Sequence, residues 1–395
     1  MRDYVEIGIG REARKAYDLN QISIVPKRRT RSSKDVDTSW HIDAYTFDIP
    51  LIARPTDAIG SPEFIIEMGK QGGLGVIDAE GLLGRHASFE DAVQEVLRGD
   101  DSEDADAEAN GSAAQAADEE DFLDYARGNV ARVRALQRLH SAELDTDLLS
   151  ERIAQVRDSG VTVAVRVSPQ NARELAPVVI KAGAEILFIQ GATVSAEHVQ
   201  QGGEPLNLKE FVGTLDVPVI AGGVYDYSTA LHLMRAGVAG VIVGGGETYR
   251  DTGIFVPMAT AIADVAAARR DYLDETEGRY VHVIADADSI SAGDIAVSIA
   301  CGADAVMLGR SFAGATEAAA GGAYWQSQAA HPRFPRGGVD VNEVDLRCPL
   351  EVVLYGPSSE PWGQTNLIGG LRRIMAKCGY TDMKSFQKAD LVVRS

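Results

Sequence analysis

The chain has 395 residues, of which 45% are hydrophobic and 24% are charged, a composition that excludes a disordered chain and argues against a coiled coil. Its 58 acidic side chains outnumber 38 basic ones, so the formal net charge at pH 7 is −20. So acidic a surface repels phosphate backbones and anionic lipid. We therefore expect neither nucleic acid nor a membrane as a partner.

The cysteines and the N-terminal residues indicate the cellular compartment. Cys301, Cys348 and Cys378 have no paired or metal-type spacing, and no Cys/His cluster accompanies them. The N-terminal residues lack the apolar core of a signal peptide, and no stretch approaches the length of a membrane span. These patterns predict a cytoplasmic protein without disulfides and without a transition-metal site.

Eight short apolar runs recur along the chain, with helix-like stretches between them. Runs that are apolar at nearly every position are typical of parallel strands buried on both faces. The predicted strands are Ile49–Ala53, Leu74–Asp78, Val161–Val167, Glu185–Gln190, Val217–Gly223, Gly240–Gly246, Val281–Asp286 and Asp304–Gly309. Eight consecutive βα units predict an α/β protein with a (β/α)8 TIM barrel, and a doubly wound open sheet is the alternative.

The rest of the chain is interpreted as decoration of one domain that spans residues 1–395. Residues 99–121, between the second and third predicted strands, carry ten acids and no base. Because they offer almost no large apolar side chain for burial, they predict a disordered insertion, either a solvated loop or an acidic docking segment. Residues 325–395 form a C-terminal extension, in which a helix, a short helix and a final strand are expected.

Two glycine-containing loops are candidates for binding an anion. Active sites of TIM barrels lie where the strands end at their carboxyl termini, which we call the mouth. After the sixth strand, Gly245 and Gly246 can present backbone amides, and Thr248 adds a hydroxyl donor. After the eighth strand, Gly309 and Arg310 open a helix and supply further donors. Such glycines also occur in ordinary tight turns, so the presence of two loops carries the hypothesis.

Two carboxylates follow predicted strands. Asp286 ends the seventh strand, where a carboxylate can accept hydrogen bonds from both hydroxyls of a ribose or can cap a helix. Asp57 follows the first strand, and capping of the next helix would explain it equally well. His282 lies within the seventh strand, and we expect it to be packed in the core or against helices.

Several segments, in the same order along the chain, resemble the IMP dehydrogenase/GMP reductase family. They are YDLNQISIVPKRRTRSSKDVD, IPLIARPTDA, EMGKQGGLGVID, VPVIAGGV, VIADADSISAGDIAVSIACGADAVMLGRSFAGATEA and NLIGGLRRIMAKCGYTDMKSFQ. The resemblance covers nearly the whole chain except the acidic insertion. It is closest to the actinobacterial IMP dehydrogenase-related subgroup, which lacks the regulatory domains that full-length IMP dehydrogenases insert between the second and third strands.

The resemblance implies a purine nucleoside monophosphate as the partner: IMP, GMP or XMP. Asp286 would hold its ribose hydroxyls, and the backbone amides of Asp288, Gly309 and Arg310 would bind its phosphate. The turn from Arg54 to Asp57 would approach the base. The resemblance also implies a homotetramer.

The family's cofactors are a nicotinamide dinucleotide, NAD or NADP, and a potassium ion. Near the nicotinamide nucleoside, Gln190 stands where the family tends to have an aspartate, and Gly223 stands where it has an asparagine. These two departures weaken the case for a nicotinamide cofactor. The loop after the sixth strand, which supplies carbonyls for potassium, is several residues shorter in this chain, which weakens the case for the ion.

The family's reaction uses a cysteine thiolate on that same loop, and this chain has GETYRDTGIFVP there. A thiol with a pKa of about 8.5 is partly thiolate at neutral pH, whereas Thr and Tyr hydroxyls are nearly all protonated. Thr248 and Thr252 are the substitute candidates. We expect a nucleotide-binding barrel that has lost the covalent hydride-transfer route. The alternatives are an active IMP dehydrogenase or GMP reductase with altered loop residues, and a flavin-phosphate barrel.

Overall fold

Eight parallel strands close into a barrel in a computed structural model that describes residues 3–99, 119–197, 206–245, 252–287, 291–332, 337–341 and 347–394, with the backbone alone for 119–127. Pairing of Val306 on the last strand with Leu51 on the first completes the closure. The (β/α)8 prediction is confirmed, and the open-sheet alternative is wrong. The strands are β6 (Leu51–Ala53), β7 (Leu74–Asp78), β8 (Ala164–Val167), β9 (Ile186–Gln190), β10 (Val219–Val224), β11 (Gly240–Val243), β12 (His282–Asp286) and β13 (Ala305–Leu308).

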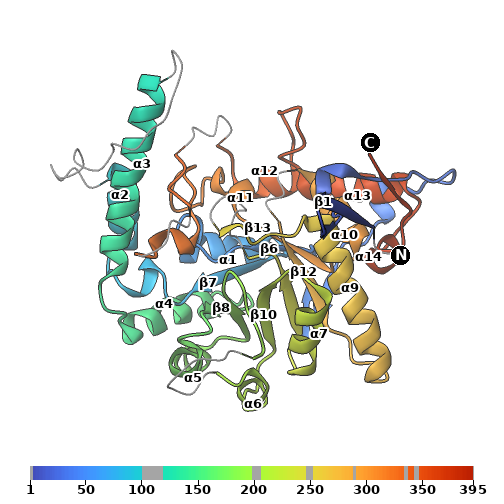
Figure 1. Ribbon diagram of the computed structural model, residues 1–395. Helices are drawn as coiled ribbons and strands as arrows, with labels where there is room; N and C mark the ends of the chain where they lie inside the picture. Colours follow the sequence, from blue (N-terminus) through green and yellow to red (C-terminus); the bar gives the residue numbers. More distant parts are fainter. Residues whose placement is uncertain are drawn as a thin grey trace.

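Helices join consecutive strands and cover the outside of the barrel (Figure 1). Several of them begin at polar capping residues: Asp226 accepts from the Thr229 amide at the start of α7 (Tyr227–Arg235), and Ser291 forms a capping box with Asp294 at the start of α10 (Ala292–Cys301). The helices between barrel strands include α1 (Pro62–Lys70), α4 (Thr146–Asp158), α5 (Ala172–Ala182), α6 (Leu208–Val212), α7 (Tyr227–Arg235), α9 (Met258–Glu275) and α10 (Ala292–Cys301), and the short helix α11 (Arg310–Ala313) follows the last strand. None of the helices in the described ranges has the length and hydropathy to cross a bilayer.

A short hairpin closes the amino-terminal end of the barrel. Its strands are β4 (Trp40–Ile42) and β5 (Tyr45–Phe47), and the Trp40 and Phe47 rings stack with centroids 5.1 Å apart. Trp40, Ile42 and Phe47 pack against the inward-facing side chains of the barrel strands, which are Ile52, Leu74, Val76, Ala164, Ile186, Phe188, Ile220, Ile242, Ile284, Ala305 and Met307. This hairpin, which we call the floor, and the barrel interior above it are apolar, and polar side chains gather at the mouth.

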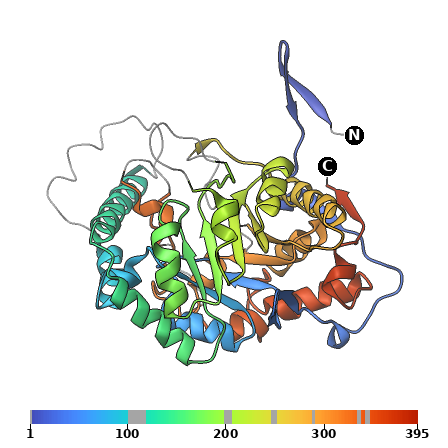
Figure 2. The ribbon, with the colours of Figure 1, turned by 90° about the horizontal axis from the view of Figure 1, so that it is seen from below.

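The ends of the chain add small sheets and helices beside the barrel. The hairpin of β1 (Tyr4–Gly8) and β2 (Arg11–Arg14) projects from the body with its apolar side chains exposed (Figure 2). β3 (Ile22–Ile24) pairs with β14 (Leu391–Val393). The expected helix, short helix and strand at the C-terminus are α13 (Leu367–Lys377), α14 (Met383–Phe386) and β14, and α12 (Leu350–Tyr355) precedes them.

The insertion between the second and third barrel strands begins with α2 (Phe89–Arg98) and continues, beyond a gap, with α3 (Glu119–His140). Residues 100–118 lie outside the described part of the chain, so disorder there stays a prediction. Residues 119–121, which the sequence analysis placed in the insertion, are the first residues of α3. The predicted division into one domain with a 325–395 extension also stays a prediction.

Candidate functional site at the barrel mouth

Three strand ends bring a buried ion pair and an amide together at the mouth. Asp286 ends β12, and Arg54, directly after β6, donates to its Oδ1 from Nε at 2.8 Å and also from Nη2. Gln190, at the end of β9, donates from Nε2 to Asp286 Oδ2 at 3.3 Å. The side chains of Arg54 and Asp286 are only 6% and 1% exposed. The carboxylate predicted to hold a ribose is therefore occupied by the chain's own guanidinium.

Tyr324, which follows α11 in the chain, lies at the mouth beside this ion pair. Its hydroxyl oxygen accepts from Arg54 Nη1 at 2.7 Å. A Cβ atom at Gly309 would lie 2.1 Å from that hydroxyl oxygen, so a larger residue there would force the Tyr324 ring to move. The Arg310 guanidinium lies 5.2 Å from the Tyr324 ring centroid and forms an ion pair with Asp340. Gly309 and Arg310 therefore lie near Asp286, as predicted, but beneath a segment that the sequence did not place there.

Close backbone packing accounts for two other mouth glycines. A Cβ atom at Gly245 would lie 1.8 Å from the carbonyl oxygen of Ala192, and one at Gly223 would lie 1.9 Å from that of Gly244. The Gly245 carbonyl also accepts from Gln328 Nε2 at 3.0 Å, within the short helix η5 (Ser327–Ala330). The end of β10 and the loops after β9 and β11 therefore pack closely on one another, and glycine permits this close approach.

Three predicted ligand contacts cannot be located. Gly246, Thr248 and Asp288 lie outside the described residues. Thr252 is described, and its hydroxyl accepts from the amide of Ile254 at 3.2 Å in a local turn. Among the described residues, the Thr252 hydroxyl contacts this amide and not a base that would activate it as a nucleophile.

Asp57 connects two loops near the mouth. Its Oδ1 accepts from the amide of Leu82 at 2.8 Å, and its Oδ2 contacts Nε2 of His140, at the end of α3, at 3.0 Å. The capping interpretation of Asp57 is wrong, because Ser61 is the residue that caps α1. Asp57 is 3% exposed, and its two oxygens already have partners within the chain.

A second polar network, which the sequence analysis missed, adjoins the first. Arg166 on β8 donates to Asp78 Oδ1 at 3.1 Å and to the carbonyl oxygen of Gln190 at 2.8 Å. Burial alone would lower the pKa of Arg166, but the carboxylates of Asp78 and Glu80 raise it, so the guanidinium stays charged. Ser327 donates to Asp78 Oδ2 at 2.6 Å. Arg166 could have been recognised from the sequence, because it is a charged residue inside an otherwise apolar predicted strand, Val161–Val167.

The three thiols are poor nucleophiles. Burial raises the pKa of Cys301, at the end of α10, to about 12. Burial also raises the pKa of Cys348 and of Cys378, which is the C-terminal capping residue of α13. All three are therefore protonated at neutral pH, and α10 runs away from the mouth toward the amino-terminal end of the barrel.

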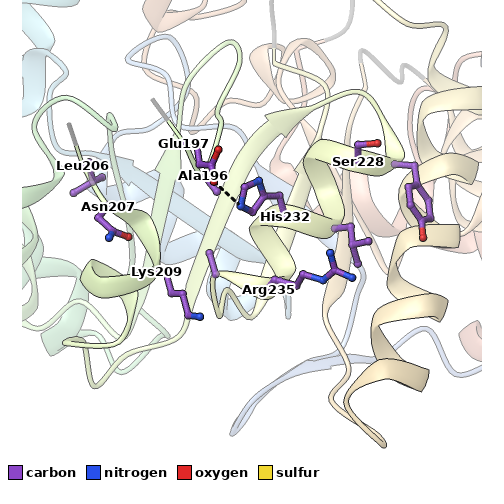
Figure 3. Close-up of a pocket in the computed structure, with 11 residues that line it drawn as sticks. Ala196, Glu197, Leu206, Asn207, Lys209, Ser228, His232 and Arg235 are labelled. Carbon is purple, nitrogen blue, oxygen red and sulfur yellow. Dashed lines mark ion pairs between the residues drawn. The ribbon is translucent and has the colours of Figure 1, made fainter. Parts of the chain in front are cut away.

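A cavity of about 730 Å³ lies on the outer side of the barrel, by α6 and α7 (Figure 3). His232 Nε2 lies 3.5 Å from a Glu197 carboxylate oxygen, and Lys209 and Arg235 also line the cavity. Residues 198–205, next to Glu197 in the chain, are outside the described part. The cavity contains none of the predicted site residues, so the mouth remains the candidate site.

Comparisons with known proteins agree with the barrel and its motifs. The sequence profile of the IMP dehydrogenase / GMP reductase domain matches residues 16–342. An uncharacterized oxidoreductase of Mycolicibacterium smegmatis is 56% identical over 397 residues, which is 99% of this chain and all of the relative. The inosine-5'-monophosphate dehydrogenase of Methanocaldococcus jannaschii is 25% identical over 489 residues, covering 97% of this chain and 93% of the relative.

A solved structure is similar along its whole length. The crystal structure of an IMP dehydrogenase/GMP reductase-like protein from Corynebacterium glutamicum shares 60% sequence identity and a TM-score of 0.89, and the match covers 99% of this chain and 98% of the other. The barrel, its strand-end residues and these full-length matches agree, and the chain belongs to the IMP dehydrogenase/GMP reductase family.

Proposed function

We propose that the barrel mouth binds a purine nucleoside monophosphate, such as IMP, GMP or XMP, and does not convert it by the covalent hydride-transfer route. One observation carries the proposal: the Asp286 carboxylate, a suitable acceptor for ribose hydroxyls, lies at the mouth near the Gly309–Arg310 turn after β13. The proposed nucleotide contacts are Asp57, Gly245, Gly246, Thr248, Asp286, Asp288, Gly309 and Arg310.

The proposed loss of covalent chemistry rests on the thiols. Attack on a purine ring requires a thiolate or an equally strong nucleophile, and the loop 246–257 has no cysteine. Cys301, Cys348 and Cys378 are kept protonated by burial. The hydroxyl of Thr252 is engaged with the Ile254 amide. On this proposal, neither the three thiols nor the Thr252 hydroxyl supplies a nucleophile at neutral pH.

The family's cofactors fit this mouth poorly. The Gln190 side-chain nitrogen faces Asp286 and lies 3.7 Å from the sulfur of Met307, so this amide takes the place of a carboxylate. Gly223 has no side chain, and the carbonyl of Gly244 fills the space where one would stand. Neither NAD nor NADP therefore takes part in the proposed function. The potassium carbonyls would come from residues outside the described ranges, and the ion has no part in the proposal.

Turnover and binding are measured separately. Purified protein with IMP and NAD is expected to give no increase in absorbance at 340 nm, and calorimetry is expected to detect heat with IMP, GMP or XMP. Asp286→Asn should abolish that heat, because an amide is a weaker acceptor for ribose hydroxyls than a carboxylate. Turnover at the rate of ordinary family members would establish the alternative, an active oxidoreductase with altered loop residues. Absence of heat with all three nucleotides would remove the binding proposal.

The family resemblance also supports a cytoplasmic homotetramer. Light scattering coupled to size-exclusion chromatography is expected to give a mass of four chains of 42.1 kDa each. The exposed apolar side chains of the β1–β2 hairpin, such as Ile7 and Ile9, are available for contacts between chains. A monomeric mass across the concentration range would contradict the tetramer.

A further inference from the structure

Arg54 and Asp286 form an ion pair at the position where the proposed nucleotide needs a free carboxylate. We propose that Arg54 is a gate for the mouth: it occupies Asp286 in the ligand-free barrel, and a ligand enters only if its own hydroxyl groups replace the guanidinium on that carboxylate. The inference rests on the proposed function. It names Arg54 as the residue that sets the affinity for the nucleotide, and neighbouring hydroxyl groups as the ligand chemistry that can displace Arg54.

The contacts of Arg54 account for the closed state. Its Nε and Nη2 reach Asp286, and its Nη1 reaches the Tyr324 hydroxyl, so all three nitrogens are engaged. Both charged side chains are almost fully buried. A buried charge without a partner is costly, so the open form is a minor part of the ligand-free population and becomes the main form only when another polar group replaces one member.

Gln190 marks the place of the incoming donor. It is 6% exposed, and its Oε1 has no hydrogen-bond partner among the described residues. The amide orientation is fixed, because turning it over would bring Oε1 against the Asp286 carboxylate. An unpaired buried acceptor beside Asp286 suits a group that donates to both oxygens at once. The site therefore favours a ligand with two neighbouring hydroxyls, as in a ribose, over one that lacks a hydroxyl.

The chain contains a matched ion pair that serves as a control. At the amino-terminal end of the barrel, Arg269 donates to Asp304 Oδ2 at 2.8 Å and to the Tyr280 hydroxyl at 2.6 Å. Arg269 and Asp304 have side chains 8% and 3% exposed. This second Arg–Asp–Tyr arrangement resembles the first in contacts and burial but lies far from the mouth. Removing its arginine leaves Asp304 paired with Lys384, so the variant should lose some stability without any effect on a ligand at the mouth.

The test compares nucleotide binding by full-length wild type, Arg54→Ala and Arg269→Ala, by calorimetry with IMP and 2'-deoxy-IMP. Arg54→Ala is expected to bind IMP about tenfold more tightly than wild type, the factor that applies when the open form is about one tenth of the population. IMP should raise the melting temperature of Arg54→Ala more than that of wild type. The rise that 2'-deoxy-IMP causes in Arg54→Ala should be much smaller than the rise that IMP causes. Arg269→Ala should bind IMP as wild type does.

The outcomes separate the gate from the binding site. If wild type binds IMP and Arg54→Ala binds it equally or more weakly, the gate is wrong and the proposed function stands. If neither protein binds IMP, and GMP and XMP also give no heat with either, both the gate and the proposed function are wrong. Should Arg54→Ala not fold, Tyr324→Phe provides the test, because it removes one acceptor from Arg54 and leaves the carboxylate paired. Unchanged IMP affinity in Tyr324→Phe would then overturn the gate.

Discussion

Asp304→Ala is expected to lower the free energy of unfolding by about 3–5 kcal/mol, because removing one member of a buried charge cluster leaves the other uncompensated. Asp304 Oδ2 accepts from Arg269 Nη1, and its Oδ1 accepts from Lys384 Nζ and from the Tyr280 hydroxyl, all within 2.7–2.8 Å. The Asp304 side chain is 3% exposed. Urea denaturation of the variant and of wild type measures the difference.

A change at an exposed ion pair provides the contrast for this prediction. Arg235 and Glu275 contact at 2.6 Å with side chains 52% and 45% exposed, so Glu275→Ala should change the stability little. Burial alone would raise the pKa of Asp304, but Arg269 and Lys384 lower it well below its usual range. The stabilisation is therefore present above about pH 4 and is lost as the pH falls further. Equal stability of Asp304→Ala and wild type at pH 7 would contradict the cluster's role.

The protein is expected to lose stability as the pH falls from 6.5 toward 4, because His282 is buried in its neutral form. Burial, helped by the charges of Lys384 and Arg269, lowers its pKa to about 4, although Asp304 and Asp43 oppose this shift. The unfolded chain, with a histidine pKa near 6.5, then binds more protons than the folded chain in this window. The contribution amounts to about 2 kcal/mol between pH 7.5 and pH 5.

Denaturation at several pH values checks this prediction, with His282→Phe as the matched variant. The His282 ring contacts the Trp40 and Tyr280 rings at centroid distances of 6.1 and 5.0 Å, so phenylalanine keeps an aromatic ring there without a titrating group. The variant should show a flatter stability profile between pH 7.5 and 5. A profile as steep as that of wild type would assign the pH dependence to other groups.

The barrel could be predicted from the sequence because its strands are buried on both faces and therefore read as continuous apolar runs. The floor hairpin was missed because its strands have three residues each, although Trp40, Ile42, Tyr45 and Phe47 alternate around a turn at Asp43. The apolar run Val281–Asp286 predicted a strand that contains His282, and His282 does lie in β12, where its ring packs against those of Trp40 and Tyr280. Three-residue strands give too little periodicity to be recognised alone.

At the mouth, the sequence predicted positions but not pairings. Asp286, Gly309 and Arg310 could be placed because strand ends define the mouth of a barrel. The contact between Arg54 and Asp286 joins residues 232 positions apart, and the one with Tyr324 joins residues 270 apart. No local pattern encodes contacts over such separations, so the occupied state of the carboxylate was visible only in three dimensions.

Trp40, Ile42 and Phe47 pack on the apolar side chains that fill the barrel, so among the described residues a molecule can approach Asp286 only from the mouth and not through the barrel. A molecule that reaches Asp286 must depart along the path by which it arrived. Return of the Arg54 guanidinium to its carboxylate would compete with return of the departed molecule, so one side chain would set both how readily the mouth is occupied and how long it stays occupied.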